Sequence, residues 1–202
     1  MKNCAERFDP AATMTGEEQE RWLVRGLQRS SARWNVVAQQ TMFAQYDFNP
    51  LPGHADAAGI FNVDQWDGYV AQRARLTEAM ASDDVSNPVV ITGDIHSSWV
   101  HDVRASYDDP ASPTVATELV GTSISSDFPA AFIAPVQAAR VDNPHTRFFD
   151  GVSRGYVLCE LTPDRWTADF RAVATIDLPS STVSTIATFV IEDGVPGAVQ
   201  DV

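Results

Sequence analysis

Hydrophobic side chains recur every three to four positions in two parts of the chain, which is the period of an amphipathic α-helix. This pattern predicts helices over residues 16–30 and 66–80, and residues 129–139 fit a shorter one. Thr15 and Glu18 have the spacing of a capping box, which would start the first helix. Between and after these segments the pattern changes to that of β-strands.

The clearest strand is the apolar, β-branched run that ends at Thr92. A β-rich segment, residues 34–43, precedes the second helix, so the order is β-α-β, with a right-handed crossover if the two strands are parallel. Residues 49–59 read as a turn-rich loop. Later strands are predicted at residues 99–104, 115–120, 156–161, 166–176 and 186–192. The chain is therefore expected to be α/β, a βαβ unit followed by mostly antiparallel strands.

A short polar turn, Gly93-Asp94-Ile95-His96, follows the strand that ends at Thr92. On extended backbone, residues i and i+2 point the same way, so Asp94 and His96 could converge on one point. Ligands of open α/β sheets usually bind at strand ends, so the turn is a candidate wall of a metal or phosphate site. The alternative is that Asp94 caps a turn and His96 is an ordinary loop histidine.

The segment Thr-Gly-Asp-Ile-His-Ser-Ser-Trp at 92–99 resembles the closing metal-binding motif of the PhoD-like alkaline phosphatases, within the calcineurin-like metallophosphoesterase superfamily. Further segments resemble that family in the same order: Thr-Met-Thr-Gly-Glu-Glu-Gln at 13–19, Trp-Asn-Val-Val at 34–37 with Gln40, Asp-Gln-Trp-Asp-Gly-Tyr at 64–69 with Arg73, Glu-Leu-Val-Gly-Thr-Ser at 118–123, and the tail at 143–156. The resemblance implies a metallophosphatase-type αββα sandwich. Residues 1–202 match only the C-terminal part of that catalytic domain, and the motifs of its N-terminal half are absent.

The resemblance also implies roles for individual residues. Asp94 and His96 would be metal ligands, with His96 essential for catalysis, in a site that holds Fe3+ and Ca2+ or other divalent metals. A carboxylate in place of the superfamily's usual first histidine favours hard cations such as calcium. Gln40 stands where the superfamily often has a metal-binding histidine. It could bind a calcium-type metal or a water, or merely hydrogen-bond neighbouring loops.

Three other polar residues are candidates for a supporting role around the metals: Glu118, His145 and Asp67. Each also has a simpler explanation. Asp64 and Asp67 flank Trp66 at the start of a predicted helix, so N-capping explains at least one of them. Glu118 precedes a small-residue turn that needs no ligand, and His145 lies in a turn-forming Asn-Pro-His sequence.

Composition limits the partners of the chain. A net charge of −13 disfavours binding to nucleic acids and anionic membranes, and no apolar run is long enough to span a bilayer. The first nine residues do not have the composition of a signal peptide, although the family resemblance implies an extracellular or periplasmic enzyme. Small phosphate esters remain compatible partners if bound cations outweigh the acidic surface.

The function expected from this sequence is hydrolysis of phosphomonoesters or phosphodiesters at a dinuclear-type metal site. We expect the chain to act as part of a longer enzyme, together with an upstream half, and to be weakly active or inactive alone, because two ligands cannot hold and clamp a catalytic metal pair. The alternative is a degenerate, non-catalytic fragment or binding domain of the same fold.

Overall fold

The computed structural model describes residues 4–50 and 58–201. A five-stranded mixed sheet lies at its centre, in the order β1-β2-β4-β3-β5. Its strands are β1 (Asn35–Ala38), β2 (Pro88–Thr92), β3 (Ser98–Arg104), β4 (Thr114–Val120) and β5 (Thr146–Asp150). Strands β1, β2 and β4 are parallel, whereas β3 runs antiparallel to both β4 and β5. The strand that leads into the Gly-Asp-Ile-His turn, β2, is thus an interior strand.

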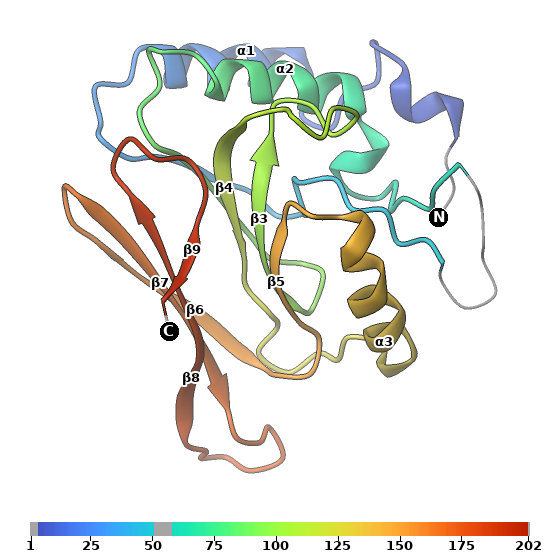
Figure 1. The fold of residues 1–202 in the computed structure, drawn as a ribbon, viewed down its shortest axis with the longest axis vertical. Helices are drawn as coiled ribbons and strands as arrows, with labels where there is room; N and C mark the ends of the chain where they lie inside the picture. Colours follow the sequence, from blue (N-terminus) through green and yellow to red (C-terminus); the bar gives the residue numbers. More distant parts are fainter. Residues whose placement is uncertain (1–3, 51–57, 202) are drawn as a thin grey trace.

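A four-stranded antiparallel sheet packs against one face of the first sheet (Figure 1). Its strands are β6 (Gly155–Leu161), β7 (Arg165–Val173), β8 (Val183–Glu192) and β9 (Val199–Asp201). Buried apolar side chains fill the space between the sheets, among them Val89, Val100 and Leu119 from the first and Phe170 and Phe189 from the second. The two sheets therefore share one dry core.

Helices cover the opposite face of the five-stranded sheet (Figure 1). The α-helices are α1 (Glu17–Gln28), α2 (Val70–Met80) and α3 (Ala130–Ala139), and short 3-10 helices span Ala5–Phe8, Trp66–Gly68 and Arg140–Asp142. Alternation along β4 serves both layers: Ala116 and Val120 pack on the helix side, and Leu119 packs against the second sheet. The α/β class is confirmed, and the described residues form three layers, α-β-β.

The predicted βαβ unit is confirmed, because α2 connects the parallel neighbours β1 and β2. The predicted capping box is wrong. Gly16, with φ of 77°, is the N-cap of α1, and no side chain caps this helix. The Thr15 hydroxyl instead accepts a hydrogen bond from Gln72 in α2. Thr15, just before α1, thus connects the start of this helix to α2 and does not cap it.

Other differences concern extended segments. Of the β-rich residues 34–43, only Asn35–Ala38 pairs in a sheet, and β5 and β9 were not predicted. Residues 51–57 of the predicted loop lie outside the described residues. No helix in the described part of the chain is long and apolar enough to cross a membrane.

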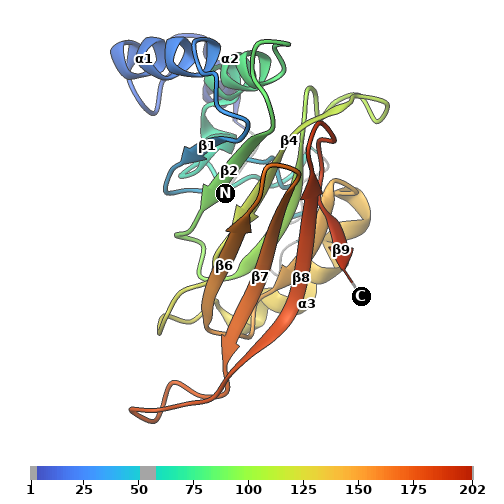
Figure 2. The same cartoon turned by 90° about the vertical axis from the view of Figure 1, so that its left-hand side faces the viewer.

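Strands β1 and β6 are the outer strands of their sheets, and both lie at the same side of the molecule (Figure 2). Val36 on β1 and Tyr156 and Leu158 on β6 are exposed large hydrophobic residues. The Trp34 indole crosses between the sheets here, donating a hydrogen bond to the carbonyl of Thr162. This side of the sandwich therefore combines free strand edges with exposed apolar side chains.

Candidate metal site

The loops that follow β1, β2 and β4 are tied together at one end of the five-stranded sheet. The N–H of Gly93 donates to the carbonyl of Gln40 at 3.0 Å, and the N–H of Gly121 donates to the carbonyl of Thr92 at 2.9 Å. These bonds extend the parallel ladder by one step on each side of β2. They place the Gly-Asp-Ile-His turn at the carboxyl ends of parallel strands, where ligands of such sheets bind.

The turn itself is not the extended segment that the sequence predicted. Asp94 has φ of 67° and His96 has φ of 60°. The N–H of Ile95 donates to the carbonyl of Gly93 at 2.8 Å, which makes a γ-turn centred on Asp94. Left-handed backbone at a residue other than glycine costs on the order of 1–3 kcal/mol and is concentrated at functional sites. The side chains of Asp94 and His96 are both exposed.

The ring contact of His96 fits the tautomer that a metal ligand needs. Its Nδ1 lies 3.3 Å from the carbonyl oxygen of Asp127. A carbonyl only accepts hydrogen bonds, so a bond here requires the proton on Nδ1, and in the neutral imidazole Nε2 then keeps a free lone pair. Such a backbone contact on the second nitrogen is the usual way in which proteins orient metal-binding histidines. Asp94 makes no side-chain hydrogen bond or ion pair within the described residues, so its carboxylate is also available.

The side chain of Gln40 is exposed, and it makes no hydrogen bond in the part of the chain that is described. Its neighbour Gln39, which the sequence did not single out, is the amide engaged with the protein. Gln39 donates to the Thr92 hydroxyl at 2.7 Å and accepts from the Trp66 indole at 3.0 Å. Gln40 is therefore held beside the turn by its backbone, with its amide free for another partner.

Glu118 lies in the core directly behind the turn. Its fully buried carboxylate accepts hydrogen bonds from the Thr92 hydroxyl and from the backbone N–H groups of Phe43 and Ala44, at 2.6 to 2.8 Å. Desolvation by burial, opposed by these three hydrogen bonds, raises the pKa of Glu118 to about 7. Because Thr92 immediately precedes Gly93, Glu118 fixes the point where the turn begins.

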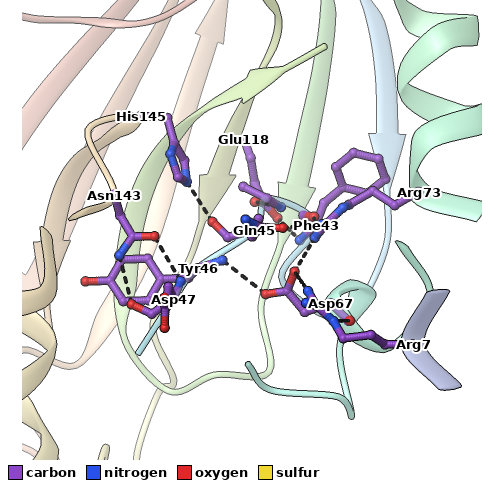
Figure 3. Close-up of polar contacts among 11 residues, drawn as sticks. Arg7, Phe43, Gln45, Tyr46, Asp47, Asp67, Arg73, Glu118, Asn143 and His145 are labelled. Atoms are coloured by element: carbon purple, nitrogen blue, oxygen red, sulfur yellow. Dashed lines mark hydrogen bonds and ion pairs between the residues drawn. The ribbon is translucent and has the colours of Figure 1, made fainter. Parts of the chain in front are cut away.

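The other two predicted supporting residues bind the backbone of residues 43–47, a segment that belongs to neither sheet (Figure 3). Asp67 accepts from the N–H of Tyr46 at 3.0 Å, and His145 donates through Nε2 to the carbonyl of Gln45 at 2.6 Å. Asn143, missed at the sequence level, bonds both backbone groups of Asp47. Asp67 is not a helix cap, because it lies inside the 3-10 helix Trp66–Gly68, whose N-cap is Gln65, and the N-cap of α2 is Tyr69.

The described residues contain two candidate metal ligands at the turn, Asp94 and His96, but no complete set. Within residues 4–50 and 58–201, no three histidine, cysteine or acidic side chains converge on a point that could hold a metal. A hollow of about 310 Å³ adjoins the turn, lined by Thr92, Gly93, Gly121, Thr122, Gly155 and Tyr156, among others. This hollow reaches the start of the turn at Gly93, but neither Asp94 nor His96 lines it.

Comparison with known proteins identifies the family of the chain. The family described as "PhoD-like phosphatase" matches residues 1–170. Alkaline phosphatase D of Bacillus subtilis (strain 168) is 39% identical over 188 residues, which are 93% of this chain but 31% of that protein. The solved structure titled "Structure of PhoD" superposes on 98% of this chain and 37% of its own, with a TM-score of 0.84 and 35% identity. The chain thus spans about a third of the relatives it matches. It belongs to the PhoD-like phosphatase family.

Proposed function

We propose that this chain carries one wall of the metal site of a phosphoester hydrolase, with Asp94 and His96 as ligands. Family membership supports phosphoester hydrolysis as the reaction class. The observation that carries the site assignment is the contact between His96 Nδ1 and the Asp127 carbonyl, because it leaves Nε2 of an exposed side chain available to a metal, two residues after the exposed Asp94.

The donor set suits the proposed metals, Fe3+ and Ca2+ or other divalent cations. A carboxylate is a ligand for hard cations, and an imidazole suits iron and similar metals. When bound, such metals polarise phosphoryl oxygens and lower the pKa of an attacking water to about 7. The γ-turn and the Asp127 carbonyl orient the two ligands, and the exposed amide of Gln40 is the candidate for a third.

The remaining ligands must come from elsewhere, because catalysis needs a closed set of metal contacts. We propose that residues 1–202 form the C-terminal portion of a PhoD-like catalytic domain and that an upstream half completes the site. The substrates would be small phosphate monoesters or diesters, drawn to bound cations rather than to the acidic surface. Placement outside the cell or in the periplasm stays a prediction from the family resemblance.

A non-catalytic role for the same fold is the second candidate. The observation that favours it is the absence of a group of three metal-binding side chains among the described residues. In that role the chain would serve binding or structure without turnover. The two candidates differ in whether the Gly93–His96 turn supports phosphoester hydrolysis when the rest of a PhoD-like catalytic domain is present.

A chimera tests the proposal. Residues 1–202 would replace the matching segment of the B. subtilis enzyme, and hydrolysis of p-nitrophenyl phosphate and bis(p-nitrophenyl) phosphate would be measured. Asp94→Ala and His96→Ala should each lower the rate about 100-fold or more without lowering the melting temperature, since both side chains are exposed. The control is Asp83→Ala, another exposed aspartate, which should be neutral. A folded but inactive chimera would favour the non-catalytic role.

A further inference from the structure

Arg154 is a buried arginine whose guanidinium contacts the backbone of the Gly93–His96 turn, called the metal turn below. Its side chain is 7% exposed and lies just before β6. One guanidinium nitrogen, NH1, lies 3.1 Å from the carbonyl oxygen of His96, 3.2 Å from the hydroxyl of Thr122 and 2.6 Å from the carbonyl of Ser153. Thr122 itself lies 3.3 Å from the same His96 carbonyl. The loops after β2, β4 and β5 therefore meet at this one nitrogen.

The energetics of this contact favour an ordering role. Removing a guanidinium from water costs several kcal/mol unless other groups compensate. The one carboxylate within ion-pair distance in the described structure is Asp127, which lies 3.6 Å away and is 85% exposed, so that pair is weak. Most of the compensation comes from carbonyl and hydroxyl oxygens of the loops around the turn. Arg154 thus holds these loops together more than it neutralises charge.

His96 is consequently held at two points. Its carbonyl is held by Arg154 and Thr122, and its ring is held by the Asp127 carbonyl. Arg154 also contacts the residue of the second anchor, because its other terminal nitrogen lies 3.6 Å from the Asp127 carboxylate, although not at the carbonyl that contacts the ring. A residue at φ of 60° is not kept there by its own preference, so external contacts must hold it.

We propose that Arg154 is the positioning residue of the metal turn: it fixes the backbone of His96 and, through the loop of Asp127, directs Nε2 toward the metal. The part of this role that concerns metal binding rests on the proposed function. The conformational part concerns the chain without any metal, so it can be measured separately.

The test uses nuclear magnetic resonance on the metal-free chain. Arg154→Met keeps length and removes the donors, Arg154→Lys keeps the charge without the fork, and Arg165→Met is the control, an exposed arginine paired with Glu192 on the second sheet. In the native chain, order parameters for the amides of residues 94–96 should be about 0.85, and the His96 ring should be mostly protonated at Nδ1. In Arg154→Met we expect order parameters below about 0.6 and a shift toward protonation at Nε2, with Arg154→Lys between.

A second measurement tests whether the positioning of His96 by Arg154 affects metal binding. In the chimera, Arg154→Met should weaken metal retention about 10- to 100-fold, the usual effect of losing a residue that orients a ligand. If Arg154→Met does not fold, Thr122→Val tests the same anchor and should give a smaller change in the same direction.

A folded Arg154→Met with native order and native ring tautomer at His96 would overturn the proposal. If the ring and backbone respond as expected but Asp94→Ala and His96→Ala leave the chimera active, the positioning role stands and the proposed function fails.

Discussion

The hydroxyl of Thr92 donates a hydrogen bond of 2.6 Å to the fully buried carboxylate of Glu118. Thr92 is the last residue of β2, and the Gly93–His96 turn starts at the next position. The same carboxylate anchors the backbone of Phe43 and Ala44, so one side chain joins the turn to the segment outside the sheets. The ionisation of Glu118 therefore bears on the stability of the whole region.

Glu118 predicts a specific dependence of stability on pH. Burial raises its pKa from 4.5 to about 7 in the folded chain, so the folded state holds a proton that the unfolded state has already lost. This contribution is fully present below pH 4.5 and is lost as the pH rises to about 7. The free energy of unfolding of the native chain should therefore fall over this pH range by up to about 3 kcal/mol more than that of Glu118→Gln. Urea unfolding across the range measures the difference.

Two buried histidines have the opposite effect. Burial lowers the pKa of His101 and His145, so the stability they give is present above pH 6.5 and is lost as the pH falls below it. Both remain in the Glu118→Gln variant, so the difference from the native chain isolates Glu118. Glu192→Gln, at an exposed glutamate, is the control. Parallel curves for the native chain and Glu118→Gln would refute the shifted pKa.

Asp67 is predicted to be essential for stability rather than for activity alone. Its carboxylate pairs with Arg7 at 3.3 Å and Arg73 at 2.5 Å, all three side chains being 3% exposed, and it also accepts from Tyr46. Asp67→Ala would leave buried cations without this carboxylate, which costs about 3–5 kcal/mol. Asp84→Ala, at an exposed aspartate, should change the unfolding free energy by less than about 0.5 kcal/mol. Equal effects in urea unfolding would contradict this account.

The free edges of β1 and β6 predict that the isolated chain self-associates. Val36 is 43% exposed and Leu158 is 52% exposed, each on an outer strand. Exposed apolar edges favour pairing between copies, and lysine on an edge opposes it. Sedimentation velocity should show concentration-dependent association that Val36→Lys combined with Leu158→Lys reduces. A compact monomer at every concentration would argue against open edges as a source of association.

Local pattern was enough to locate most of the elements. Helical periodicity found α1 and α2, and the apolar run before Gly93 identified an interior strand. Residues 39–43 show why the rest was missed. They belong to the segment predicted as β-rich, yet the N–H of Phe43 donates to Glu118, a side chain distant in sequence, and not to a neighbouring strand. Hydrogen bonds between residues distant in sequence leave no periodic pattern, so they cannot be predicted from the sequence alone.

The candidate site was likewise predicted only in part from the sequence. The sequence singled out Asp94 and His96 by residue type and spacing, but it assumed extended backbone where the structure has a γ-turn. Asp127 lies in no motif, and Arg154 lies in the tail that resembles the family but was given no role, because the two act through a backbone carbonyl and a buried guanidinium. A single arginine before a strand could not have been assigned this contact without the fold.

The most direct test of the central claim is a titration of the chain with Mn2+ alone, followed by paramagnetic broadening of side-chain resonances. The account predicts weak binding, since two ligands do not make a full site, with broadening centred on Asp94 and His96. Asp94→Ala and His96→Ala should each abolish it. Broadening centred on other acidic residues, or unchanged in both variants, would contradict the assignment of this turn as a metal site.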